Sequence, residues 1–148
     1  MPLVARGLSA CLALWIAGCA TAPPVQLADL PFPAPSSGPG RPAIDNQSLK
    51  QIDEGWRALR SGDVAAARLL AAKAGANPAA RLLELQAAIV AQTGDSFRQL
   101  SELTADTPGY AAAWLTLSVA AEDIGNERAA LEAAERGAEL WPDGRWRD

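Results

Sequence analysis

The stretch at residues 58–70, ALRSGDVAAARLL, places a glycine and an aspartate between two runs that favour a helix. The same arrangement returns at 91–100, AQTGDSFRQL, and at 121–134, AEDIGNERAALEAA. The glycines of these three stretches are Gly62, Gly94 and Gly125. They lie 32 and 31 residues apart, and glycine tolerates the positive φ of a tight turn between helices. Because Asp and Asn favour the start of the next helix, the pattern predicts a repeated helix pair.

Helix signals between these turns predict six helices within residues 44–148. Asn77-Pro78 and Thr107-Pro108 each place a capping residue before a proline at the first helical position. Ser48 with Gln51 is typical of a capping box for the first helix. Apolar residues recur at steps of three and four, for example Tyr110, Trp114, Leu117, Ala121 and Ile124. We therefore expect an all-α domain of three antiparallel helix pairs, with a generic helical bundle as the alternative.

A repeat of paired helices at this period resembles the tetratricopeptide repeat, whose period is 34 residues. The residues that match its signature are Gly62, Gly94, Trp114, Leu117, Gly125, Ala130 and Pro142. The resemblance implies a short right-handed solenoid of three hairpins, in which the first helix of each pair lines a concave peptide groove. The residues implied at this groove are Leu49, Ile52, Trp56, Leu59, Arg81, Glu84, Leu115, Val119 and Glu122. Trp56 also lies on an ordinary apolar stripe, so core packing is an alternative role for it.

The amino-terminal residues carry the features of an export signal. Arg6 precedes an apolar run at 8–17, which is shorter than the roughly 20 residues of a membrane span. Ile16-Ala17-Gly18-Cys19 resembles the lipobox of bacterial lipoproteins, which implies cleavage between Gly18 and Cys19 and lipidation of Cys19. An uncleaved anchor helix is the alternative, and it is disfavoured by Pro23 and Pro24 at its end.

Three segments follow from these features: a cleaved signal peptide at 1–18, the lipidated cysteine with a disordered linker at 19–43, and the repeat domain at 44–148. The linker holds seven of the eleven prolines and has no apolar period. Phe32, which lies within it, is interpreted as a spacer residue rather than a docking residue. Ala20 follows the cysteine, which in a Gram-negative source implies an outer-membrane anchor facing the periplasm. In another source the anchor would be the cell membrane, with the domain on its extracytoplasmic side.

Composition removes several classes of activity. The chain has no histidine, Cys11 leaves with the signal, and Cys19 is consumed by lipid, so histidine- and thiol-based catalysis and common zinc ligands are excluded. Residues 1–18 hold one of the 13 basic residues and no acidic residue, so the remaining chain has 12 basic and 17 acidic residues and a net charge of −5. This net negative charge is the opposite of the excess of basic residues with which proteins bind nucleic acid. We expect no enzyme, no metal and no cofactor other than the covalent lipid.

The leading functional hypothesis is an envelope lipoprotein that acts as a scaffold or adaptor for a protein or peptide partner. Small lipoproteins of this type resemble pilotins and envelope-assembly accessories, and the bilayer would be reached through Cys19. Self-association through the last repeat, giving a homo-oligomer, is the second hypothesis. The third is a cell-wall enzyme that uses carboxylates such as Glu84 and Glu122, although nothing in the sequence marks such a pair.

Overall fold

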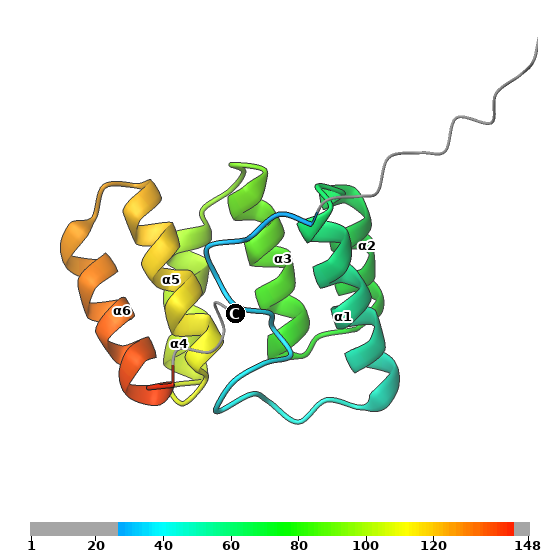
Figure 1. Cartoon of the computed structure of the whole chain (residues 1–148), viewed down its shortest axis with the longest axis horizontal. Helices are drawn as coiled ribbons and strands as arrows, with labels where there is room; N and C mark the ends of the chain where they lie inside the picture. The colour runs from blue at the N-terminus through cyan, green and yellow to red at the C-terminus, as the bar shows by residue number, and fades with distance from the viewer. Residues whose placement is uncertain (1–26, 144–148) are drawn as a thin grey trace, which may run out of the picture.

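A computed structural model describes residues 27–143, which form six α-helices and no strand. The helices are α1 (Asn46–Arg60), α2 (Val64–Lys73), α3 (Pro78–Val90), α4 (Ser96–Asp106), α5 (Ala111–Asp123) and α6 (Glu127–Leu140). Each helix packs on the next one along the chain, and α3 also contacts α1 and α5. Figure 1 shows the result as a row that runs from α1 and α2 at one end to α6 at the other. The expected all-α fold is confirmed for these residues, whereas the signal peptide at 1–18 and Cys19 lie outside them.

The start of each helix follows from local hydrogen bonding. Five of the six helices begin after an Asp or Asn whose side chain accepts a backbone N–H of the first turn. These N-cap residues are Asp45, Asp63, Asn77, Asp95 and Asn126. The turns before α2, α4 and α6 contain Gly62, Gly94 and Gly125, whose φ values are 86°, 74° and 72°. The three predicted glycine turns and the helix starts that follow them are therefore confirmed.

Two of the predicted helix starts are wrong. α1 is capped by Asp45, whose carboxylate accepts the Ser48 N–H at 2.9 Å, so Ser48 already lies inside the helix. Thr107 closes α4 instead of opening α5, because its hydroxyl donates to the Leu103 carbonyl at 2.6 Å. α5 begins at Ala111, after a short turn. In both places the residue predicted to cap the helix makes a different local hydrogen bond. Ser48 bonds to Asp45, and Thr107 bonds to Leu103.

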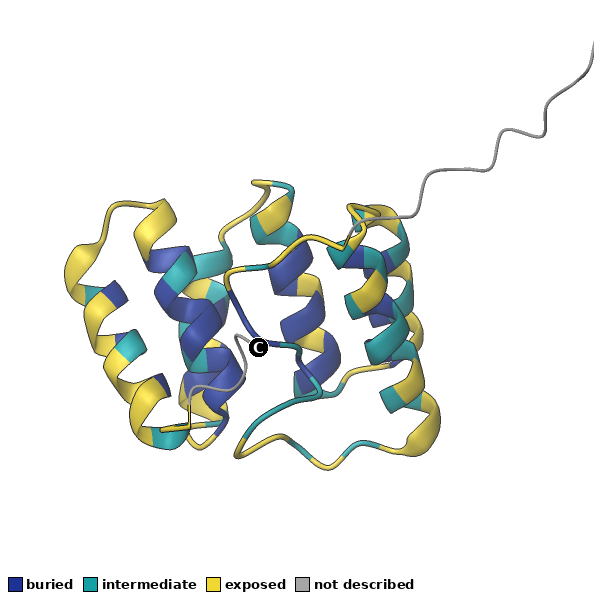
Figure 2. Ribbon diagram, in the orientation of Figure 1, coloured by how far each residue is buried: buried dark blue, intermediate teal, exposed yellow. Residues whose placement is uncertain are grey.

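The helices approach closely because small residues lie where they meet. A Cβ atom added to Gly55 of α1 would lie 2.5 Å from Leu83 Cδ2 of α3. A Cβ atom added to Gly137 of α6 would lie 2.6 Å from Leu115 Cδ2 of α5. Both distances are far inside van der Waals contact, so larger residues would push the helices apart. Figure 2 shows the buried residues concentrated on α3 and α5, at the centre of the row.

Residues 27–43 form an ordered segment that crosses the helices, so the prediction of a disordered linker at 19–43 is wrong for these residues, whereas residues 19–26 lie outside the described range. We call residues 27–43 the strap, and the surface of α1, α3 and α5 that it crosses the odd-helix face (Figure 1). Phe32 is 1% exposed, and its cluster includes Leu59 of α1 and Leu83 of α3. Pro33 and Pro35 are also buried. The interpretation of Phe32 as a spacer residue is therefore wrong, because its ring is part of the hydrophobic core.

Replacing Phe32 with Ala should lower the free energy of unfolding by about 3–5 kcal/mol, the usual cost of removing a buried aromatic ring. Leu27→Ala is the matched control, because Leu27 lies in the same segment but is 44% exposed and should change stability by less than about 0.5 kcal/mol. Urea unfolding of the full chain, followed by circular dichroism at the helix band, measures both. Equal midpoints for the two variants would show that the strap contributes nothing to the fold.

Candidate functional site: a groove beside the strap

Proline carbonyls of the strap accept hydrogen bonds from the odd-helix face. Proline has no N–H, so it can offer only its carbonyl oxygen to a neighbouring element. Three such carbonyls are bonded: Pro33 to the Gln86 side chain of α3, Pro35 to the Tyr110 hydroxyl before α5, and Pro39 to the Ala111 N–H of α5. The strap is therefore held through its backbone, at points spread over its length.

Gln86 joins the strap to two helices. The side chain is 0% exposed, and its Nε2 donates to the Pro33 carbonyl at 2.9 Å and to Thr116 Oγ1 of α5 at 3.0 Å. A buried amide that loses such partners costs about 1–3 kcal/mol, so the contact is specific as well as stabilising. The strap is also tied to α1, because Ser36 Oγ donates to Asp53 Oδ1 at 2.5 Å.

Tyr110 fixes the strap beside α5. Its hydroxyl donates to the Pro35 carbonyl, and its ring is fully buried in the main core cluster. Burial raises the pKa of Tyr110 above its usual value, and the nearby positive charge of Arg41 opposes this shift only in part. The phenol therefore stays neutral, and remains a hydrogen-bond donor, over the whole ordinary pH range.

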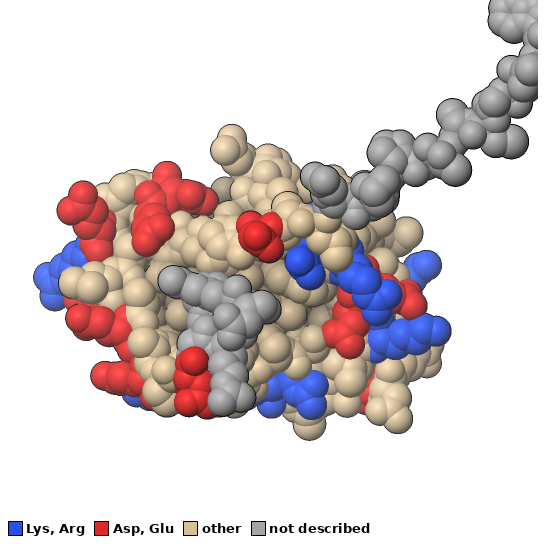
Figure 3. Space-filling model, in the orientation of Figure 1, with Lys and Arg blue, Asp and Glu red and all other residues tan. Residues whose placement is uncertain are grey.

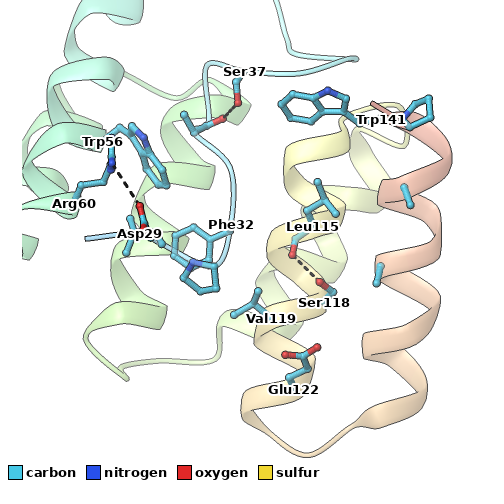
Figure 4. A pocket seen from close by; sticks show the side chains of 16 residues that line it. Asp29, Phe32, Ser37, Trp56, Arg60, Leu115, Ser118, Val119, Glu122 and Trp141 are labelled. Carbon is cyan, nitrogen blue, oxygen red and sulfur yellow. Dashed lines mark hydrogen bonds and ion pairs between the residues drawn. The ribbon is translucent and has the colours of Figure 1, made fainter. Parts of the chain in front are cut away.

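A groove of about 1110 Å³ opens beside the strap, between α1 on one side and α5 with α6 on the other. Figure 4 shows its side chains. The strap contributes Asp29 and Phe32, α1 contributes Trp56 and Arg60, α5 contributes Leu115, Val119 and Glu122, and the end of α6 contributes Ala138 with Trp141 beyond it. The rings of Phe32 and Trp56 pack with centroids 6.0 Å apart and planes at 54°. The volume of the groove is close to the upper end of the roughly 300–1,000 Å³ typical of ligand pockets. Aromatic and aliphatic side chains line much of the groove.

The structure brings together four of the nine residues implied at the groove. Trp56, Leu115, Val119 and Glu122 all line it, although they come from helices at opposite ends of the row. Trp56 is half-buried, so it packs against Phe32 and also presents part of its surface to the groove. The core-packing role of Trp56 is therefore shown in part, and its contact with a peptide stays a prediction.

The other five residues do not line this groove. Ile52 and Leu59 are 0% and 1% exposed, because their face of α1 is covered by neighbouring helices and by the strap, and Leu49 is half-buried outside the groove. Arg81 and Glu84 line a separate hollow of about 470 Å³ between α2, α3 and the end of α4. Their prediction as groove residues is wrong, because the strap covers the middle of the odd-helix face and their side of α3 points away from it.

The repeat-signature residues of the third helix pair have structural roles. Trp114 is half-buried, and its indole Nε1 donates to the Pro108 carbonyl at 3.0 Å. Leu117 of α5 is buried in the main core cluster and Ala130 of α6 is also buried, whereas Pro142 lines the groove.

Sequence reasoning missed the residues that the strap brings to the site. Leu30 and Phe32 are large apolar residues within a proline-rich stretch, which was a signal that this segment packs on something. Gln86 is a polar residue inside the otherwise apolar run at 85–90, which was a signal for a buried hydrogen bond. Trp141 had no comparable signal, since its ring is placed by a close approach to the backbone at Gly38.

The charges at the groove are mostly acidic. Asp29 and Glu122 are exposed at its walls, and Arg60 lies 4.0 Å from Asp29. Among the described residues, no cation lies within ion-pairing distance of Glu122. Figure 3 shows acidic side chains gathered over the α5 and α6 end of the molecule. A ligand with positive charge beside an apolar group would match these walls.

Residues 27–143 contain no group of three or more His, Cys, Asp or Glu side chains that could hold a metal ion. No helix in this range is long and apolar enough to cross a membrane. Comparison of the chain with protein-family models, with curated proteins and with solved structures found no match. The function is therefore inferred from the sequence, the fold, the strap and the groove.

Gly40→Ala should disrupt the contact between the strap and the backbone at Gly109. Gly40 has φ +70°, and an added Cβ would lie 1.7 Å from the Gly109 carbonyl oxygen, so the two backbones would have to separate. Gly75→Ala is the matched control, because Gly75 has φ +84° but open space around its Cβ position and should cost only about 1–2 kcal/mol. Urea unfolding measures the difference, and Gly40→Ala should be clearly the more destabilising. A smaller effect at Gly40 than at Gly75 would contradict this close contact.

Alkaline pH should destabilise the fold through Tyr110. Its folded pKa is raised above the unfolded value of about 10, so its contribution is complete below about pH 10 and is lost as the pH rises toward the folded pKa. The urea midpoint should therefore fall between about pH 10 and pH 11.5, and less steeply in Tyr110→Phe. Because Tyr110 is the only tyrosine, absorbance at 295 nm follows its ionisation directly. Ionisation of Tyr110 near pH 10, in a chain whose helical dichroism is intact, would contradict the burial of its hydroxyl as a hydrogen-bond donor.

Proposed function

We propose that this chain is a membrane-tethered scaffold or adaptor of the cell envelope that binds an extended segment of a partner protein in the groove beside the strap. The observation that carries the proposal is the way the odd-helix face binds polypeptide within its own chain. That face holds a proline-rich, turn-containing segment by its carbonyl groups, through Gln86, Tyr110 and Ala111, and buries one aromatic side chain, Phe32. Backbone hydrogen bonds combined with an aromatic anchor are general features of peptide recognition.

The groove extends this binding surface to a second polypeptide. Trp56 and Leu115 offer apolar contacts from opposite walls, and aromatic anchors usually supply most of the energy of a protein interface. The strap itself forms one side, so an incoming segment would lie against helices and strap together. Rigid helical walls lower the entropy that such binding costs.

The arrangement of the helices supports a repeat array of the tetratricopeptide type. The two helices of each of the three pairs are joined by the same kind of glycine turn, and the first helices of successive pairs contact each other. Gly55 and Gly137 lie at tight helix contacts, which is the role that small residues have in such repeats. Arrays of this kind bind partners on the surface formed by the first helix of each pair.

The lipobox sequence supports a lipid anchor at Cys19, which would place the domain on the periplasmic side of the outer membrane in a Gram-negative cell. Three acyl chains would hold it permanently, since two membrane signals already give stable anchoring. Because the strap begins at residue 27, only residues 20–26 separate the anchor from the folded domain. Eight extended steps span at most about 26–29 Å, so the groove would remain close to the bilayer.

A photocrosslinker at the groove tests the proposal. Benzoylphenylalanine at position 56 or 119 should give the same discrete partner adduct in living cells, and Ala138→Arg should weaken it by filling the groove. Position 69 is the control, because Leu69 is exposed on α2 and away from the groove. If positions 56 and 119 give no adduct beyond that of position 69, the scaffold proposal fails.

The anchor is tested separately with an alkynyl palmitate analogue. The wild-type chain should incorporate the label and fractionate with membranes, because the lipobox implies acylation of the Cys19 thiol. Cys19→Ser is the control and should lose both properties while keeping the same helical dichroism. A wild-type chain that takes up no label would remove the lipoprotein part of the proposal.

A further inference from the structure

The described chain ends beside the groove. Trp141 and Pro142 line it at the end of α6, and Asp143 is the last described residue. The Trp141 ring lies against the strap backbone, because a Cβ added to Gly38 would be 2.4 Å from its Cζ3 atom. This contact places the last described residues at the rim of the groove.

Residues 144–148, Gly-Arg-Trp-Arg-Asp, have the composition that the groove walls favour. Trp146 is an aromatic side chain of the kind that anchors peptides in apolar grooves, and the apolar walls include Phe32, Trp56 and Val119. Arginine stacks on aromatic rings and pairs with carboxylates, so Arg145 and Arg147 suit a groove of this composition.

The charge distribution favours the same occupant. Glu122 is an exposed carboxylate of the groove wall with no cation within pairing distance among the described residues, whereas Asp29 on the other wall already has Arg60 at 4.0 Å. Arg145 and Arg147 are the only basic residues that follow Arg136 in the sequence. An indole flanked by guanidinium groups would therefore meet apolar walls at its centre and the Glu122 carboxylate at one side.

The segment is long enough to enter the groove. Five extended residues span about 16–18 Å, and the segment starts at the rim rather than at a distance from it. A tethered ligand of this length binds at a high effective concentration, in the millimolar range for a short flexible connection. Even a weak contact would therefore keep the segment in place.

We propose that the segment Gly144–Asp148 is an intramolecular ligand of the groove, with Trp146 inserted between the walls and an arginine paired with Glu122. This goes beyond the proposed function, because the contact forms within one chain and is measured with no partner present. A partner segment would have to displace these residues, and it would present the same chemistry, an aromatic residue flanked by arginines.

Fluorine NMR of the full chain labelled with 5-fluorotryptophan, in detergent micelles, tests the proposal. The chain has five tryptophans, and Trp146→Phe identifies the resonance of Trp146. The change of its shift from H₂O to D₂O reports contact with water. We expect a small change in the wild type, close to that of a buried indole.

Two groove variants should release the tryptophan. Ala138→Arg fills the groove from an exposed position of α6, and Glu122→Lys reverses the charge that pairs with the segment. Asp123→Lys is the matched control, because it makes the same charge change at the next residue of α5, which is exposed but does not line the groove. Both groove variants should raise the isotope shift of Trp146 toward that of free 5-fluorotryptophan, and Asp123→Lys should leave it unchanged.

Three results would overturn the proposal. The first is a water-exposed Trp146 in the wild type, and the second is a buried Trp146 that responds to neither groove variant. The third is burial that disappears on dilution, which would assign the groove to the segment of a second copy. None of these results depends on whether the crosslinking test of the scaffold function succeeds.

Discussion

The contact between the strap and the odd-helix face organises this molecule. A single row of helix pairs leaves apolar side chains of α1, α3 and α5 without a covering layer, and the strap supplies that layer along part of the row. Phe32 of the strap is part of the hydrophobic core. The side chains of Gln86 and Tyr110 donate hydrogen bonds to the carbonyls of Pro33 and Pro35. Proline also restricts the unfolded strap, which lowers the entropy lost when it is ordered.

The same contact creates the groove as well as covering the helices. Because the strap lies between α1 and α5 without filling the space above them, Trp56 and Leu115 become facing walls of one surface. Residues from the two ends of the helix row thereby take part in one candidate site. The strap, which belongs to none of the helices, thus forms one side of the groove. Its packing on the helices also shortens the tether to the proposed anchor.

Charge and apolar surface are distributed differently along the row. The outer face of α6 carries intrahelical ion pairs, such as Arg128 with Glu132 at 2.8 Å, which suit a solvated surface and each add only a few tenths of a kcal/mol. The groove instead combines exposed acids with aromatic side chains. This separation favours the groove over the outer face of α6 as the site of the proposed polypeptide binding.

The sequence by itself determined the helices and most of their ends, because the capping bonds of Asp63 and Asn126 and the turns at Gly62 and Gly125 depend only on neighbours along the chain. The resemblance to a tetratricopeptide repeat also named four residues that line the groove, Trp56, Leu115, Val119 and Glu122. The position of the strap could not be predicted in this way, because Pro33 and Gln86, which share a hydrogen bond, are 53 residues apart and no local signal indicates that they meet. Burial of one side chain against another depends on how the helices pack, so only the tertiary structure decided which segment covers the odd-helix face and where the groove opens.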